Sequence, residues 1–287
     1  MLYECHGHIM MDGEDFSRAR ERHGSGVDRS AVECALAALQ EAGVGWFRDG
    51  GDAYGVSLLG RELAPEYGIE YSTPGFAIHK KGRYGSIVGR AYETMEDFRA
   101  LVSELKADGG DFVKIMLSGI ITFKEYAHLS CPGLEAGEIA ELVKIAHGEG
   151  LAVMVHVNGA DTIRAAVLAG VDSVEHGYFA EEDTLSLMAE RKTVWTPTLA
   201  AVEAFIDRPG IDSAVARKTL DGQLRMLTLA RSRGVIVASG SDSGAVGVPH
   251  GAGTRREYEL LSRAGISGDE LRRGNEFLRK KFSPRRN

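Results

Sequence analysis

The sequence predicts an α/β fold, namely a (β/α)8 TIM barrel formed by a single domain over residues 1–287. Three observations support this prediction. The length suits a barrel, which typically needs about 250 residues. Short apolar runs rich in β-branched residues alternate with longer segments of helical periodicity. Glycine often follows the helical segments, as in helix C-caps. Repeated helix–glycine–strand units indicate parallel strands joined by right-handed crossovers.

The predicted elements follow one another along most of the chain. Strands are expected at residues 2–6, 45–48, 69–72, 112–116, 152–156, 172–175, 193–196 and 235–238. Helices are expected at residues 29–42, 95–107, 137–149, 160–169, 181–190 and 213–233. Eight such strands favour a closed barrel over an open doubly wound sheet. The irregular stretches 12–28, 75–90 and 119–132 follow early strands, where barrel enzymes place substrate loops, and the basic tail 279–287 is expected to fray.

The composition argues against several classes of partner. Charged residues make up 26% and hydrophobic residues 44% of the chain, which is ordinary for a soluble globular protein. A net charge of −7 disfavours binding to nucleic acid or to an acidic membrane surface. No apolar stretch suggests a signal peptide or a membrane span. Three cysteines without metal-type spacing indicate a reducing compartment. We therefore expect a cytoplasmic protein that acts on a small molecule, and the composition leaves a homo-oligomer open.

The first candidate site residues are His6 and His8, at the end of the first predicted strand. Side chains two residues apart in a strand point to the same face, so the two imidazoles would converge. Such a pair can clamp a metal ion, with Gly7 leaving room for the backbone. Two solvated histidines at a strand end would give the same pattern.

Two further histidines close later strands. His156 ends an apolar run, and His176 ends another one βα unit later. Each alone is more typical of a core histidine, but neighbouring strand ends that both carry histidine favour a shared metal site.

Asp242 and Lys114 complete the series. Asp242 follows the eighth predicted strand and would lie beside His6 in a closed barrel, although an ordinary turn aspartate is the alternative. Lys114 lies inside an apolar strand, where a buried ammonium is expensive. Carboxylation of Lys114 by CO2 would give an anionic carbamate with two oxygens for metals. Alternatively, Lys114 reaches the barrel rim or pairs with an acid such as Asp49.

The ordered set of HxH, Lys, His, His and Asp on strands one, four, five, six and eight resembles the amidohydrolase superfamily. The chain is most similar to the branch of imidazolonepropionase-like proteins and metal-dependent dipeptidases. The stretches 45–51, 110–116, 169–177 and 249–251 also fit, and the resemblance covers residues 2–265. It implies a metal-dependent hydrolase with one or two divalent ions, expected to be zinc, which attacks an amide or related C–N bond with a metal-bound hydroxide.

The resemblance also implies a role for each residue. His6, His8 and Asp242 would hold the more buried ion, His156 and His176 the more exposed one, and carboxylated Lys114 would bridge them. Asp242 would also be the general acid–base.

His250 lies in the loop after Asp242 and is a candidate for contacting substrate or polarising its carbonyl, or is an ordinary loop histidine. Tyr84 and Tyr126 lie in irregular loops that could cover the mouth, although each is more typical of a surface residue than of a catalytic one.

Two features depart from the branch pattern. The usual β-sandwich segment around the barrel is not expected in this sequence, and Asn158 stands where a second histidine often follows His156. Dipeptides, N-acyl amino acids and cyclic amides all fit as substrates. Hydrolysis of an ester, lactone or organophosphate, ring deamination, or a barrel that binds metal or ligand without turnover are the alternatives.

Overall fold

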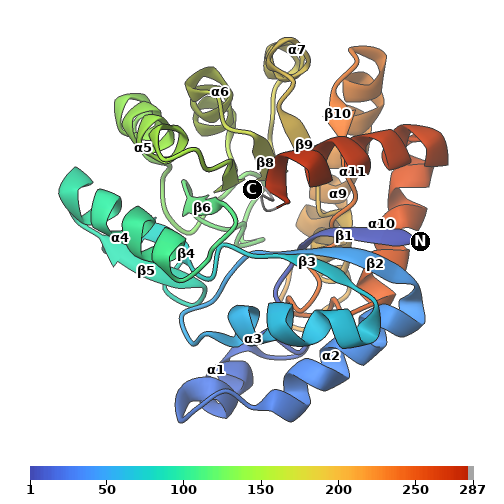
Figure 1. The fold of residues 1–287 in the computed structure, drawn as a ribbon. Coiled ribbons are helices and arrows are strands. Elements are labelled where there is room, and N and C mark those ends of the chain that lie inside the picture. Colours follow the sequence, from blue (N-terminus) through green and yellow to red (C-terminus); the bar gives the residue numbers. More distant parts are fainter. Residues whose placement is uncertain (284–287) are drawn as a thin grey trace.

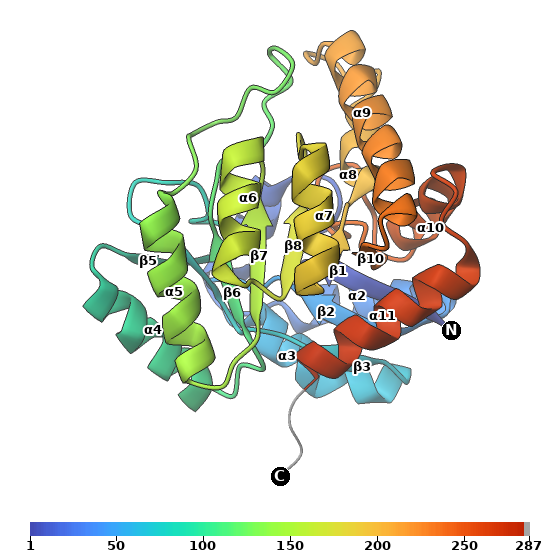
Figure 2. The same cartoon turned by 90° about the horizontal axis from the view of Figure 1, so that it is seen from above.

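The computed structural model describes residues 1–283, and its parallel strands form a ring surrounded by helices (Figures 1 and 2). The strands are β1 (Leu2–Gly7), β2 (Val44–Asp49), β3 (Glu70–Ser72), β4 (Ala77–Lys80), β5 (Gly89–Tyr92), β6 (Val113–Met116), β7 (Val153–Val157), β8 (Ser173–His176), β9 (Val194–Thr196) and β10 (Ile236–Val237). Each of the predicted strand ranges overlaps one of them, so the barrel prediction is confirmed.

Two sheets make up the ring. One has the order β1-β2-β3, and the other has the order β10-β9-β8-β7-β6-β4-β5. Two short strands, β3 and β4, together take the place of the third strand of the barrel. β3 pairs with β2 on one side, and β4 pairs with β6 on the other. At this seam Asp111 N donates to Thr73 O at 2.8 Å. At the other seam Cys5 N donates to Ser239 O and Asp242 N donates to His6 O, at 2.8 and 2.9 Å. These bonds place β1 beside the segment that follows β10.

The helices cover the outside of the ring. They are α1 (Phe16–Gly24), α2 (Arg29–Ala42), α3 (Val56–Leu63), η1 (Ala64–Tyr67), α4 (Met95–Ala107), α5 (Ala136–Gly148), α6 (Ala160–Ala169), α7 (Glu182–Arg191), α8 (Leu199–Glu203), α9 (Ser213–Ser232), α10 (Ala252–Arg263) and α11 (Gly268–Phe282). In Figure 1, α4, α5, α6 and α7 form an outer arc. The main hydrophobic core lies between such helices and the strands. Among the described residues, no helix has both the length and the apolar character needed to cross a membrane.

Three expectations for irregular segments need correction. The range 12–28 contains α1, which Asp15 caps by accepting a hydrogen bond from Ser17 N. The range 75–90 contains β4 and the beginning of β5. The tail was expected to fray from residue 279, but α11 continues to Phe282, and residues 284–287 lie outside the described part. The loop 119–132 is irregular, as predicted.

Helix α11 closes the N-terminal end of the barrel. Its Leu278 and Phe282 are fully buried in a cluster with inward-facing residues of the strands, among them Trp46 and Met154. Ser267 and Glu270 form a capping box at the start of this helix. Residues 1–283 contribute no β-sandwich, and α11 fills the base of the ring.

We predict that Gly274→Ala destabilises the fold, because a Cβ at this position of α11 would lie 1.9 Å from the Val237 carbonyl oxygen of β10. The expected loss in the free energy of unfolding, measured by urea denaturation, is about 1–3 kcal/mol. Gly137→Ala in α5 is the matched control, since its Cβ would meet nothing within 4 Å. Gly137 lies in the first turn of α5, so this change should alter the free energy of unfolding by no more than about 0.5 kcal/mol. Equal effects of the two substitutions would contradict the close packing of α11 on β10.

Candidate metal centre

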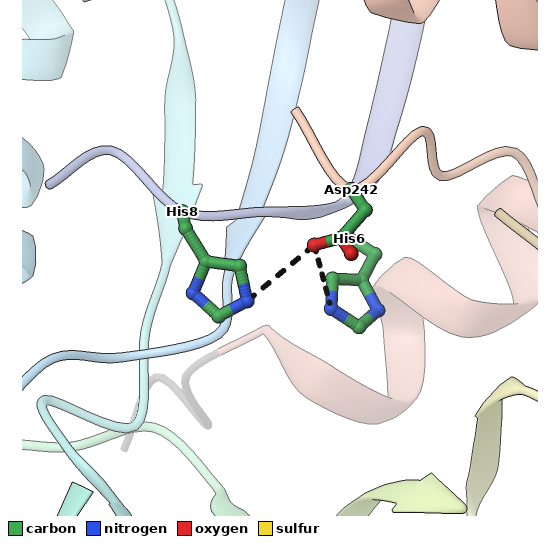
Figure 3. A group of neighbouring side chains, drawn as sticks. All are labelled: His6, His8 and Asp242. Carbon is green, nitrogen blue, oxygen red and sulfur yellow. Dashed lines mark ion pairs between the residues drawn. The ribbon is translucent and has the colours of Figure 1, made fainter. Parts of the chain in front are cut away.

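Three predicted ligands converge at the C-terminal mouth of the barrel (Figure 3). His6 and His8 come from the end of β1, and Asp242 comes from the segment after β10. The Nε2 atoms of both histidines lie 3.6 Å from Asp242 Oδ1. One ligand atom from each residue lies within 4.8 Å of the others. Asp242 has a left-handed φ of 63°, which aspartate adopts more readily than most side chains.

Buried polar partners orient His6. Its Nδ1 lies 2.8 Å from Glu175 Oε2 of β8, which leaves Nε2 directed to Asp242. The other Glu175 oxygen accepts a 2.8 Å hydrogen bond from Arg48 Nη2 of β2. Arg48 also donates to the Cys5 carbonyl oxygen at 2.6 Å. A carboxylate behind a ligating histidine is a common way to fix its ring orientation.

The backbone near β2 sets the position of His8. A Cβ on Gly50 would lie 2.2 Å from Cε1 of the His8 ring. Any residue other than glycine at position 50 would therefore clash with this ring. Asp49 accepts hydrogen bonds from Ile9 N at 3.0 Å and from the Tyr71 hydroxyl at 2.7 Å. The chain just after His8 is therefore anchored to the end of β2.

His156 and His176 form a second pair beside the first. Their ring centroids lie 4.5 Å apart, and the His176 ring lies 4.9 Å from that of His6. His176 Nδ1 lies 2.8 Å from Thr198 Oγ1, and His156 Nε2 lies 3.2 Å from the Gly119 carbonyl oxygen. The ends of β7 and β8 thus bring both histidines to the same mouth, as predicted.

Lys114 on β6 is buried and lines the same cavity, yet its Nζ has no hydrogen-bond partner among the described residues. It does not form the ion pair with Asp49 that the sequence left open, since the Asp49 oxygens accept from Ile9, Gly51 and Tyr71. Burial lowers the pKa of Lys114 to about 8. An unpaired ammonium in a barrel interior is costly, so this position calls for a partner or a chemical change.

The electrostatics keep the histidines neutral. Burial, followed by the charge of Lys114, lowers the pKa of His8 and of His156 to about 3. The same causes lower the pKa of His6. Burial raises the pKa of Asp242 to about 6, although the charge of Lys114 opposes that shift. Neutral imidazoles and a carboxylate are the donor set that zinc and similar divalent ions take, so the four histidines and Asp242 fit such a group. Lys114 Nζ, which has no hydrogen-bond partner among the described residues, would fit it only once its positive charge is removed.

These side chains open into a cavity of about 400 Å³. His6, His8, Lys114, His156, His176 and Asp242 all line it. The structure therefore brings together the six predicted metal-site residues.

His250 is not brought to this cavity wall. Its Nδ1 lies 2.7 Å from Ser243 Oγ, and its Nε2 lies 2.8 Å from the Met11 carbonyl oxygen. Both ring nitrogens are occupied, and the contact with Ser243 supports the residue next to Asp242.

Two residues of the site, Glu175 and Arg20, were missed from the sequence, and a third, Tyr84, was assigned to the surface as the more typical position. Glu175 was readable as a charge inside a buried strand, the same signal that singled out Lys114. Tyr84 lies in a loop that could cover the mouth, and its ring lines the cavity with its centroid 5.1 Å from that of His156, whereas a surface position was the more typical expectation. Arg20 lines the cavity from α1, and no local pattern marked it.

The sequence also matches known proteins. Residues 5–279 match the sequence model of the amidohydrolase family. An uncharacterised protein of Mycobacterium tuberculosis is 34% identical over 137 residues, which is 45% of this chain and 36% of that protein. Ochratoxinase of Aspergillus niger is 26% identical over 196 residues, which is 65% of this chain and 38% of that protein. The matched segments thus span little more than a third of these curated relatives.

Solved structures share the fold. A Xaa-Pro dipeptidase with methionine in its active site superposes with a TM-score of 0.76 at 21% identity, covering 98% of this chain and 75% of that one. The A. niger ochratoxinase structure gives a TM-score of 0.73 at 20% identity, covering 96% and 68%. Since the family match covers nearly the whole described chain, this protein belongs to the amidohydrolase family.

Proposed function

We propose that this protein is a metal-dependent hydrolase that cleaves an amide or related C–N bond of a small molecule. The observation that carries the proposal is the convergence of His6, His8 and Asp242, whose ligand atoms lie within 4.8 Å of one another inside the cavity. His156, His176 and Lys114 line the same space.

His6, His8 and Asp242 would hold one divalent ion, and His156 and His176 a second, with zinc as the expected metal. When bound, such ions supply Lewis-acid polarisation of the scissile carbonyl and a water that ionises near neutral pH. Lys114 would bridge the two sites after carboxylation. In that step the neutral amine attacks CO2, a bond forms between Nζ and carbon, and one proton is released.

Asp242 is the proposed proton carrier. Its carboxylate lies at the cavity wall and would accept a proton from the attacking water, then donate it to the leaving nitrogen as the C–N bond breaks. The raised pKa of Asp242 lies closer to neutral pH than that of an exposed aspartate. Such a pKa suits a carboxyl group that both accepts and donates a proton. His250 would assist this proton transfer indirectly, because its hydrogen bond to Ser243 fixes the residue next to Asp242.

The activities for which similar proteins are named support an amide bond as the bond that is cleaved. They include an ochratoxinase, a Xaa-Pro dipeptidase and a bottromycin amidohydrolase. The size of the cavity, about 400 Å³, supports a small-molecule substrate, and the net charge of −7 supports a partner other than nucleic acid. The free thiols Cys5, Cys34 and Cys131 support a cytoplasmic location.

We predict that Asp242→Asn lowers kcat for amide hydrolysis by roughly 10²- to 10⁴-fold, because the amide side chain cannot carry the proton. Asp207→Asn is the matched control. Asp207 has the same φ of 63° but pairs with Arg217 at the surface. It should leave turnover and the melting temperature unchanged.

The same assay includes a chelator arm. Treatment of the wild type should abolish hydrolysis, and zinc should restore it. Full activity of the chelated protein, or of Asp242→Asn, would refute the proposed mechanism.

A second prediction concerns Lys114→Met. In metal-free protein this change should raise the free energy of unfolding by about 1–3 kcal/mol, since it removes an unpartnered buried ammonium. In protein purified without chelator it should lower the metal content, measured by elemental mass spectrometry.

Lys144→Met, at a side chain that is 80% exposed, is the control for both measurements. A metal content equal to that of the wild type would place Lys114 outside the metal site.

A further inference from the structure

The cavity is strongly apolar away from the metal ligands. Its walls include Met11, Ile87, Phe123, Val202 and Phe205, from several different loops and helices. Among the described residues, Arg20 is the charged side chain that lines the cavity outside the predicted metal group. A substrate for this space therefore needs a large apolar part and one anionic group.

Arg20 is a solvent-exposed side chain at the open rim of the cavity, where it can receive such an anion. It lies one helical turn after Phe16 on α1, and both residues line the cavity. Two neighbouring arginines on this helix have acidic partners: Arg18 pairs with Glu14, and Arg22 lies 3.7 Å from Asp12. Within residues 1–283, Arg20 forms no ion pair. A guanidinium without a partner beside an apolar cavity suits a carboxylate, which it can bind through two parallel hydrogen bonds.

The same wall offers no place for a free ammonium group. Among the described residues, Asp242 is the carboxylate that lines the cavity, and it is assigned to the metal group. The ammonium of a dipeptide would lose its hydration against apolar side chains without gaining a partner. An acyl chain at this position would instead bury apolar surface.

We propose that Arg20 binds the carboxylate of an N-acyl amino acid whose apolar acyl chain fills the cavity. This inference rests on the proposed function and names the substrate class for that site. The reaction adds water across the amide: the bond between the acyl carbon and nitrogen breaks, a carbon–oxygen bond forms, and the nitrogen takes the proton. The products are a fatty or other apolar carboxylic acid and a free amino acid.

The test compares three substrates that differ at one end. These are N-hexanoyl-L-leucine, its C-terminal carboxamide and the dipeptide Leu-Leu. The wild type should show a kcat/KM for the N-acyl acid roughly 10- to 100-fold above that for the carboxamide, since a charge-assisted bidentate contact is lost in the latter. The dipeptide should also be poorer than the N-acyl acid. Equal or faster hydrolysis of Leu-Leu would overturn the assignment of the acyl chain.

Arg20→Met should remove the preference for the acid over the carboxamide, through KM rather than kcat, and Arg20→Lys should retain part of it. Arg18→Met removes the same charge from the same helix but not from the cavity wall, and should behave as the wild type. Loss of activity on both substrates to the same extent in Arg20→Met, or an unchanged preference for the acid, would overturn the role of Arg20.

A binding measurement separates this inference from the proposed function. If the wild type hydrolyses none of the three compounds, the proposed function fails for this class, and N-hexanoyl-L-leucine serves as a ligand in calorimetry. The wild type should then bind the acid roughly 10- to 100-fold more tightly than the carboxamide, and Arg20→Met should bind the two equally. Equal binding of both compounds by the wild type would overturn the carboxylate site itself.

Discussion

The ion pair between Arg48 and Glu175 organises the interior of this barrel. It joins β2 to β8 across the ring, and both side chains are fully buried. Each charge alone would be costly at this depth, so each depends on the other and on further hydrogen bonds. Arg48 supplies these to the Cys5 carbonyl and to Ser173, while its guanidinium lies 4.5 Å from the Phe282 ring centroid of α11. The pair thus connects the base of the barrel to its strands.

The same pair shapes the metal centre above it. Arg48 occupies one oxygen of Glu175, and the second oxygen is directed to His6 Nδ1. His6 consequently presents Nε2 to Asp242, and burial keeps the imidazole neutral. Lys114 has no such partner among the described residues, and its charge lowers the pKa of the histidines around it. Conversion to a carbamate would replace that positive charge with a negative one. This change would turn an environment that repels cations into one that attracts them.

Much of this arrangement could be predicted from the sequence, because the relevant signals are local. Helices α2, α4 and α6 begin and end at the predicted residues. Four site residues could be recognised as polar residues at the end of, or within, apolar runs, namely His6, Lys114, His156 and His176. Closure of the ring then brought these ends together without further information.

What was missed depends on contacts that are distant in sequence. Helix α1 buries only Ala19 and His23 in the described structure, so its apolar signal is weak, and it was predicted as a loop. The capping box of helix α11 could be recognised in the sequence. The burial of this helix could not, because it depends on contacts with strand residues at the base of the barrel. The third strand of the barrel is split into β3 and β4 because they pair with different neighbours, β2 and β6, and these pairings are also distant in sequence.

Asn158 shows how a departure from the branch pattern can be accommodated at the mouth. Its Nδ2 donates to the Gly119 carbonyl and its Oδ1 accepts from Tyr178 N, each at 3.2 Å. The amide therefore ties the loop after β6 to the loop after β8, and its Nδ2 lies 3.4 Å from His156 Nε2. Asparagine can donate and accept at once without a change of protonation state, whereas a neutral histidine divides these roles between two ring nitrogens. Position 158 can thus hold two loops of the mouth together while the metal ligands come from the strand ends.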